Sequence, residues 1–218
     1  MPTSGQFAPL VAAGLVAAAL AWPSSASAEP GTVGSLSSSE CPTNIVKGST
    51  NSWCVSTLQS VLQQLGFDLS VDGQFGDQTL AAVKWVQTKA HLQDSSVGVD
   101  GQVGPVTKRW LETFIDNQVV SLGDGCGLDL ITSPNSGSGT AQAYISEYAA
   151  DGAGYCTGTL FRSTDGGRSW TAVSGEHTEA NNQSVTTYAY ADTSTELAKV
   201  CGTGTGPNLV DSGCTAAF

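Results

Sequence analysis

The sequence is poor in basic residues and lacks metal-binding patterns. Of its 218 residues only 8 are lysine or arginine, against 19 aspartates and glutamates, and the formal net charge is −11. Because clustered basic side chains are what hold a phosphate backbone, this deficit argues against nucleic-acid binding. The chain has two histidines, and none of its six cysteines belongs to a C-x-x-C pair, so the spacing typical of zinc sites is absent. We therefore expect no metal and no cofactor.

The longest apolar run of the sequence lies near its start and is short. Residues 10–21 are apolar and are followed by small residues that end in Ala26-Ser27-Ala28, a pattern typical of a secretory signal peptide. The run is too short to cross a membrane as a helix. We expect residues 1–28 to be a cleaved signal peptide rather than an interfacial anchor, with no membrane span after cleavage and a secreted protein as the product. The Gly- and Ser-rich residues 29–40 predict a flexible leader.

The cysteines follow the expected cleavage site, and their even number predicts an oxidised framework of up to three disulfides. Cys41 and Cys54 flank a short polar segment, so we pair them first. The sequence leaves the connectivity of the other four open and favours Cys156 with Cys201 among the possibilities. The full set is Cys41, Cys54, Cys126, Cys156, Cys201 and Cys214.

One phrase occurs twice, 28 residues apart: Val-Asp-Gly-Gln-Phe-Gly at 71–76 and Val-Asp-Gly-Gln-Val-Gly at 99–104. Glycine suits positive φ and aspartate closes local turns, so each copy predicts a loop that begins a helix. Apolar residues at three- and four-residue spacing predict helices over 55–65, from 77 and from 105. Three further expectations concern single positions: Gly66 ends the first helix, Asp77 caps the second, and the core contains Val71, Phe75, Val99 and Val103.

The composition changes at Cys126. Short segments rich in Thr, Tyr and Val predict strands at 141–150, 155–164, 169–174, 184–191 and 196–201. Turn residues at 151–154 and 165–168 predict hairpin connections. The fold class expected is therefore α+β in two domains: a small three-helix bundle at 41–125, followed by a disulfide-stabilised, antiparallel β-sandwich-like domain at 127–218.

The helical part resembles a known family. In order and spacing it is similar, over about residues 54–114, to the peptidoglycan-binding domain of the three-helix type. The matching positions are Val55, Leu58, Gln59, Leu62, Leu65-Gly66-Phe67, both repeated loops, Thr79, Ala82-Val83, Gln87, Pro105, Thr107 and Trp110-Leu111. Trp85-Val86 replaces the family's usual hydrophobic-aromatic pair, and residues 93–98 lengthen the approach to the second loop. The resemblance implies non-catalytic binding to peptidoglycan or a muropeptide, with the helical domain targeting the β domain to the cell wall.

The chemistry of the residues places the candidate ligand contacts in the two loops and on two helices. Amide and carboxylate groups can hydrogen-bond a sugar or a stem peptide, and an indole can stack on a sugar ring. The alternative is that the aspartates only close turns and that the tryptophans only pack within the bundle. The loop glutamines have no evident role in the core and are the favoured contacts. The candidates are Asp72, Gln74, Trp85, Asp100, Gln102 and Trp110.

Two other functions stay open for the β domain. It could be the catalytic part of a cell-wall hydrolase, although its cysteines are expected in disulfides and His177 is its only histidine. A pair of carboxylates would have to come from Glu147, Asp151, Glu176 and Glu179, which we interpret as surface acids, so we do not expect an enzyme. The second alternative is that the β domain inhibits or captures another secreted protein at the wall.

Residues 163–170, Ser-Thr-Asp-Gly-Gly-Arg-Ser-Trp, resemble the Asp-box turn found in sialidases and other β-propeller proteins. In those folds the box is structural, and a single copy in a domain of this size cannot build a propeller. The segment therefore predicts a β-hairpin turn and no glycosidase activity.

Overall fold

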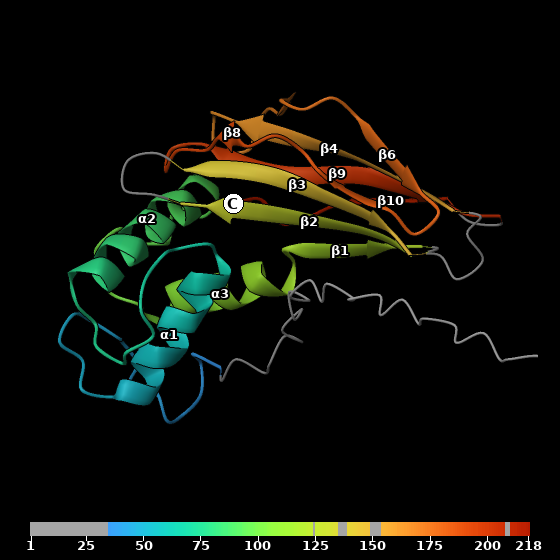
Figure 1. Ribbon diagram of the computed structural model, residues 1–218. Coiled ribbons are helices and arrows are strands. Elements are labelled where there is room, and N and C mark those ends of the chain that lie inside the picture. Colours follow the sequence, from blue (N-terminus) through green and yellow to red (C-terminus); the bar gives the residue numbers. More distant parts are fainter. Residues whose placement is uncertain (1–34, 124, 135–138, 149–153, 208–209) are drawn as a thin grey trace, which may run out of the picture. The chain divides into compact units, whose positions relative to one another are not determined.

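The computed structural model describes residues 35–123, 125–134, 139–148, 154–207 and 210–218. The expected signal peptide, residues 29–34 of the expected leader, residues 149–150 of the expected strand 141–150 and the expected turn residues 151–153 lie outside them. The segment Val33–Phe218 is one compact unit, in which three helices precede two antiparallel sheets (Figure 1). Within the described part, no helix is both long and apolar enough to cross a membrane.

The three helices form where the hydrophobic periodicity predicts them, as α1 (Ser52–Gln64), α2 (Asp77–Gln93) and α3 (Pro105–Asp116). Helix α1 ends as expected, because Gly66 has a φ of 89° and donates its N–H to the carbonyl of Gln63, while Phe67 donates to Leu62. This pair of bonds satisfies carbonyls that the helix end leaves free, and only glycine adopts the required backbone without strain.

The second helix begins differently from the expectation. Its N-cap is Gly76, with no side-chain cap, and Asp77 is instead its first residue. The carboxylate of Asp77 lies in the first turn, where the helix dipole favours negative charge, and pairs with Lys47 at 2.5 Å. Pro105 occupies the start of α3 as predicted, since a proline there removes no intrahelical hydrogen bond.

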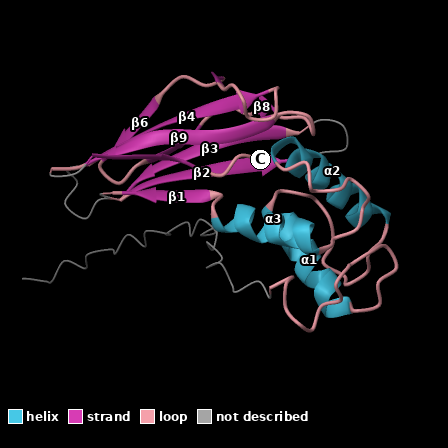
Figure 2. Cartoon of the chain, turned by 180° about the vertical axis from the view of Figure 1, so that it is seen from behind, coloured by secondary structure: helices cyan, strands magenta, loops and turns pink. Residues whose placement is uncertain are grey.

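The β part is a two-sheet sandwich, as expected (Figure 2). The first sheet has the order β1 (Val119–Leu122), β2 (Cys126–Ser133), β3 (Thr140–Glu147), β7 (Ser184–Thr186), and β8 (Tyr190–Ala191) also pairs with β3. The second has the order β10 (Val210–Cys214), β9 (Leu197–Thr205), β4 (Tyr155–Ser163), β5 (Thr171–Ala172), and β6 (His177–Ala180) also pairs with β4. All pairings among these strands are antiparallel.

The two sheets approach each other closely across a shared core. Leu128, Leu130 and Ile145 of the first sheet are fully buried, as are Leu160 and Val200 of the second. A Cβ on Gly158 of β4 would lie only 2.3 Å from the side chain of Ile145, so this glycine permits the contact.

Four strands were not expected from the sequence: β1, β2, β6 and β10. Strand β2 alternates buried and partly buried residues, but Gly127 and Asp129 obscure its period of two. Strand β1 lies at 119–122, inside the range 41–125 assigned to the helical domain, and pairs with β2. The sheet therefore begins directly after α3.

The disulfides are Cys41–Cys54, Cys126–Cys156 and Cys201–Cys214. The first pairing confirms the prediction, and the favoured pairing of Cys156 with Cys201 is wrong. The register of β4 and β9 aligns Cys156 with Gly204, three residues from Cys201, so the two cysteines point to opposite faces. Cys156 instead reaches across the sandwich to Cys126 of β2, and Cys201 lies opposite Cys214 in β10.

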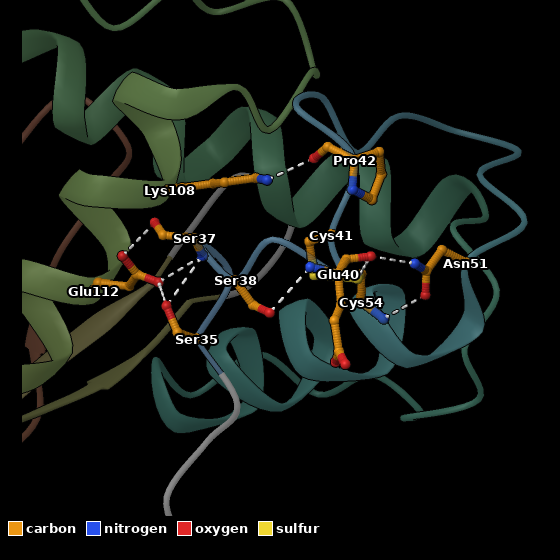
Figure 3. Close-up of a disulfide and its surroundings, with 10 residues drawn as sticks. All are labelled: Ser35, Ser37, Ser38, Glu40, Cys41, Pro42, Asn51, Cys54, Lys108 and Glu112. Atoms are coloured by element: carbon orange, nitrogen blue, oxygen red, sulfur yellow. Dashed lines mark hydrogen bonds between the residues drawn. A yellow bond between two sulfur atoms is a disulfide. The ribbon is translucent and has the colours of Figure 1, made fainter.

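The described end of the expected flexible leader is packed against the helices. Leu36 is only 1% exposed. The hydroxyls of Ser35 and Ser37 donate to the carboxylate of Glu112 at 2.8 and 2.7 Å (Figure 3). Residues 35–40 are therefore not the flexible leader that was predicted. One apolar side chain and two hydroxyls contact the folded helices, and nothing in the local sequence indicates these contacts.

Candidate functional site

The first repeated loop is held by a buried glutamine from α1. The side chain of Gln59 is 2% exposed, and its Nε2 donates to Asp72 Oδ1 at 2.8 Å and to the carbonyl of Gln74 at 3.1 Å. Its Oε1 accepts the N–H of Gly73 at 2.8 Å, and Thr79 Oγ1 lies 3.3 Å from Nε2. One amide thus satisfies three groups of the loop and contacts the first turn of α2.

The second loop is held in the same way by a glutamine from α2. Gln87 is fully buried, and its Nε2 donates to Asp100 Oδ1 at 3.1 Å and to the carbonyl of Gln102 at 2.8 Å. Its Oε1 accepts the N–H of Gly101 at 2.8 Å, and Thr107 Oγ1 lies at 3.4 Å. The 28-residue period therefore includes the helix glutamine, the Asp-Gly turn and the threonine of the next helix.

Both loop aspartates close their own turns. Asp72 Oδ1 accepts the N–H of Gln74 at 2.9 Å, and Asp100 Oδ1 accepts the N–H of Gln102 at 2.8 Å. The hydrogen bond from the Gln59 amide, followed by that from the Gln74 backbone, lowers the pKa of Asp72 below its ordinary value. One oxygen of each carboxylate is thus used in hydrogen bonds within its own loop and to the buried glutamine.

The loop positions divide into buried and exposed ones. Phe75 and Val103 are 3% and 0% exposed and belong to the core as predicted. The prediction was wrong for Val71 and Val99, which are 41% and 46% exposed, because the tight turn directs these side chains outward.

Each loop requires its first glycine. Gly73 and Gly101 have φ values of 71° and 80°, a left-handed backbone that side chains disfavour. The second glycines, Gly76 and Gly104, have φ values of −91° and −85°, which other residues also adopt, so their backbone conformation does not require glycine.

A segment closed by the Cys41–Cys54 disulfide contacts both loops. Ile45 is fully buried and pairs with Val103 of the second loop through two backbone hydrogen bonds of 3.2 and 2.9 Å. Gly48 donates its N–H to the carbonyl of Phe75 in the first loop at 3.1 Å. The segment is itself anchored, since Lys108 of α3 donates to the carbonyl of Pro42 at 2.7 Å (Figure 3). The two loops are therefore held by hydrogen bonds to one segment, which the disulfide closes covalently.

Gln74 and Gln102 are exposed loop side chains that the two loop networks do not use. Both are exposed, and within the described part of the chain neither side-chain amide has a hydrogen-bond partner. Their backbones are fixed by the networks of Gln59 and Gln87, so each amide projects from a defined position. An exposed primary amide offers two donors and an acceptor, which suits hydroxyl, acetamido and peptide groups.

The two candidate tryptophans lie in an aromatic cluster around Phe218. The ring centroid of Trp85 is 5.5 Å from Phe67 and 5.3 Å from Phe218, and that of Trp110 is 5.6 Å from Phe114 and 6.0 Å from Phe218. Phe218 is fully buried, whereas both indoles are partly buried. A residue from the far end of the chain thus supplies much of their packing.

One segment carries both networks, both loops and most of the helical core, and it has a known family counterpart. Residues 54–111 match the putative peptidoglycan binding domain. The match covers about a quarter of the chain, confirms the resemblance and supports peptidoglycan as the partner of this peptidoglycan-binding domain. No curated protein and no solved structure matches the chain.

The peptidoglycan-binding domain and the three disulfides together support an extracellular or cell-wall location, because disulfides persist in oxidising environments. The matched segment ends at residue 111, before the first strand. The role of the β part is therefore outside what the family match addresses.

The acids considered for a hydrolase have different surroundings. The interpretation of Glu147 as a surface acid is wrong: it is fully buried and accepts the N–H of Asn182 at 2.8 Å, so a substrate cannot reach it without rearrangement. Glu176 is exposed, Glu179 is partly buried on β6, and Asp151 lies outside the described residues. Among the described residues, no group of three or more His, Cys, Asp or Glu side chains is placed to hold a metal ion.

The turn at 163–170 is a β-hairpin between β4 and β5. Asp165 accepts hydrogen bonds from the hydroxyl of Ser169 at 2.6 Å and from its N–H at 2.9 Å, and these bonds lower the pKa of the carboxyl to about 2. Trp170 donates its indole N–H to the carbonyl of Gly167 at 3.0 Å. Asp165 is thus engaged within its own turn.

The sequence analysis names Gln59 and Gln87 as positions that match the family but misses their role in holding the loops. Gln59 and Gln87 are separated by the same 28 residues as the loops. Each lies 13 residues before the aspartate of its loop, so extending the repeat backwards would have indicated that each glutamine belongs to a loop. A buried glutamine is also uncommon, and it requires partners such as a nearby turn.

Proposed function

We propose that this protein binds peptidoglycan without catalysis and that its helical domain holds the β part at the cell wall. The match of residues 54–111 to the peptidoglycan-binding family carries the proposal. The paired loops support it, because they present two exposed amides from backbones fixed by buried hydrogen bonds. A rigid site loses little conformational entropy when a ligand binds.

The contacts that we assign to the ligand are the side chains of Gln74 and Gln102. Hydrogen bonding fits the charge of the protein better than ionic attraction does, since a net charge of −11 gives no general attraction to an anionic polymer. Asp72 and Asp100 act mainly by shaping the loops, and their remaining carboxylate oxygens can accept from a ligand hydroxyl.

Sedimentation with insoluble peptidoglycan tests this assignment. The double variant Gln74→Ala/Gln102→Ala should bind at least tenfold more weakly, with an unfolding midpoint in urea close to that of the wild type, because both side chains are exposed. The matched control is Gln64→Ala/Gln183→Ala, which removes two exposed glutamines outside the loops and should bind normally. Equal sedimentation of both double variants and the wild type would remove the loop glutamines from the site.

Release of soluble fragments from peptidoglycan tests the non-catalytic role. The full-length protein, incubated with purified peptidoglycan over hours, should release no more soluble amino sugar than buffer alone. Release that rises in proportion to protein concentration would show a hydrolase. The experiment uses the whole chain, because Phe218 forms part of the helical core and the two parts cannot be assumed to fold separately.

A further inference from the structure

A pocket of about 820 Å³ lies where the helical part meets the first sheet. Its walls come from the loop after α1, one face of α2, and the ends of β2, β3 and β8. The lining residues include Phe67, Asp68, Gln78, Ala81, Trp85 and Thr140. Five of its thirteen lining residues lie beyond position 111, so the pocket is not contained in the family-matched segment.

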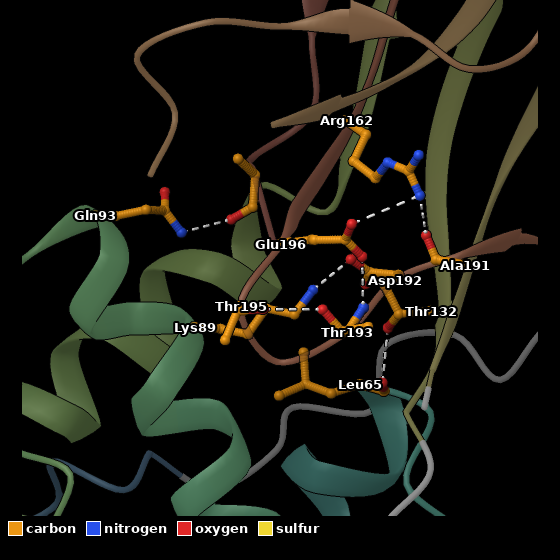
Figure 4. Close-up of polar contacts among 11 residues, drawn as sticks. Leu65, Lys89, Gln93, Thr132, Arg162, Ala191, Asp192, Thr193, Thr195 and Glu196 are labelled. Atoms are coloured by element: carbon orange, nitrogen blue, oxygen red, sulfur yellow. Dashed lines mark hydrogen bonds and ion pairs between the residues drawn. The ribbon is translucent and has the colours of Figure 1, made fainter. Parts of the chain in front are cut away.

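The two sides of this junction pocket are locked together. The hydroxyl of Thr132 donates to the carbonyl of Leu65 at 2.7 Å (Figure 4). A Cβ on Gly66 would lie 2.0 Å from the carbonyl oxygen of Thr132, so only glycine permits this approach. Within the β part, a Cβ on Gly139 would lie 2.6 Å from the carbonyl oxygen of Asp192, so the backbones beside β3 and β8 are also in close contact. The walls are therefore held by backbone contacts and are formed before a ligand arrives.

The junction pocket combines aromatic rings with small residues. Trp85 and Phe67 line it and meet edge to face, with ring centroids 5.5 Å apart. Ala81 and Ala82 lie on the same face of α2, and their short side chains leave space beside the indole. Partly buried aromatic rings beside open space provide an apolar surface on which the C–H face of a sugar ring can stack.

The polar groups of the junction pocket are almost all uncharged. Gln78, Ser133 and Thr140 provide amide and hydroxyl groups that can donate and accept hydrogen bonds. Among the described residues that line the pocket, Asp68 is the only ionisable one, and no cation is present. Phosphate-rich and carboxylate-rich ligands are therefore disfavoured, both by the pocket and by the acidic chain.

We propose that the junction pocket binds uncharged pyranose units of a glycan chain, as a second site of the protein in addition to the loop glutamines. The identity of that glycan as the sugar strand of peptidoglycan rests on the proposed function. The volume lies within the range of about 300–1,000 Å³ typical of small-molecule sites, which leaves room for a short oligosaccharide. The β part then contributes directly to wall recognition through Ser133, Thr140 and Ala191.

Calorimetric titration of the full chain with tri-N-acetylchitotriose tests the junction pocket. The wild type should bind this neutral trisaccharide, and Ala81→Trp, which fills the pocket from the helix surface, should bind at least tenfold more weakly. Thr113→Trp places the same ring at an exposed position of α3 and should bind normally. Gln78→Ala should weaken binding several-fold, whereas the exposed helical control Gln64→Ala should not.

The outcomes separate this inference from the proposed function. Absence of chitotriose binding by the wild type, or equal binding by Ala81→Trp, would overturn the junction pocket as a glycan site while sedimentation with peptidoglycan still tests the proposed function. A free stem peptide could instead bind the wild type and not Ala81→Trp, while the trisaccharide binds neither protein. That result would overturn the glycan assignment of the junction pocket in favour of a peptide ligand. The wild type could also bind the trisaccharide, with Ala81→Trp failing to bind it, and yet not sediment with peptidoglycan. That result would support the junction pocket as a glycan site and refute the proposed function.

Discussion

Lys89 of α2 and Asp192, between β8 and β9, form an ion pair that is closed to solvent (Figure 4). Nζ lies 2.6 Å from Oδ1, and the two side chains are 0% and 2% exposed. The ammonium also lies 4.7 Å from the ring centroid of Trp85 and 5.3 Å from that of Phe218. Burial lowers the pKa of Lys89 to about 8 and raises that of Asp192 to about 6, each against the opposing effect of its partner. Desolvation therefore exceeds the attraction, as is common for buried pairs.

Removing only the lysine gives a prediction whose size depends on pH. In Lys89→Met the carboxyl loses its cation, so its pKa rises further above about 6 and the protein folds with Asp192 neutral. Keeping neutral a carboxyl whose ordinary pKa is 3.8 costs about 1.4 kcal/mol for each pH unit above that value. Relative to an ordinary carboxyl, the resulting penalty is about 4 kcal/mol at pH 7 and about 2 kcal/mol at pH 5. The wild-type Asp192, whose pKa is about 6, itself gains about 1 kcal/mol over that range, so the loss relative to the wild type should shrink by about 1 kcal/mol.

The direction of the change in stability with pH depends on whether the folded or the unfolded chain binds protons more tightly. A carboxyl with a raised pKa in the folded state binds protons more tightly there than in the unfolded chain, so stability is gained as pH falls from the folded pKa toward 3.8. Lys89→Met should therefore recover part of its loss on acidification from pH 7 to pH 5, relative to the wild type at each pH.

Urea unfolding at pH 5 and pH 7, with disulfides intact, measures the difference. The control Lys89→Met/Asp192→Asn contains neither charge and does not titrate at this site, so its stability relative to the wild type should fall by about 1 kcal/mol from pH 7 to pH 5, a change opposite to that of Lys89→Met. A loss in Lys89→Met that is equal at the two pH values, or larger at pH 5, would refute the reasoning that the uncompensated carboxylate causes it.

The remaining predictions concern the loops and the shared core, and urea denaturation measures each. Gln59→Ala leaves buried loop groups without partners and should cost about 2–3 kcal/mol, whereas a loss below about 0.5 kcal/mol would show that water replaces the amide. Gly73→Ala must adopt a positive φ and should cost more than about 1 kcal/mol, while Gly76→Ala, where a Cβ meets open space, should stay within about 0.5 kcal/mol; equal midpoints would contradict the difference. Phe218→Ala removes a fully buried ring and should cost about 3–5 kcal/mol, and an unchanged midpoint would argue against one continuous core.

The helices and loops of the binding domain were predictable because their signals are local. A helix shows its buried face within a few turns, and the Asp-Gly phrase carries its own turn chemistry, so Gly66 and Gly73 could be assigned from neighbouring residues alone. The strands β2 and β10 were missed because glycine, serine and aspartate in them are tolerated only through pairing with partners distant in sequence. The Cys201–Cys214 disulfide depends on the same register, which no local pattern records.

By itself, the sequence determined the three helices, the repeated loops, the Cys41–Cys54 bridge and the family to which the helical segment is matched. Only the tertiary structure decided that Lys89 meets Asp192, 103 positions away, and that Phe218 completes the aromatic cluster of the helices. It also decided that a pocket exists between the helical part and the first sheet. Local structure follows from interactions within one turn or hairpin, whereas these contacts arise when hydrophobic burial brings distant surfaces together and selects which side chains meet.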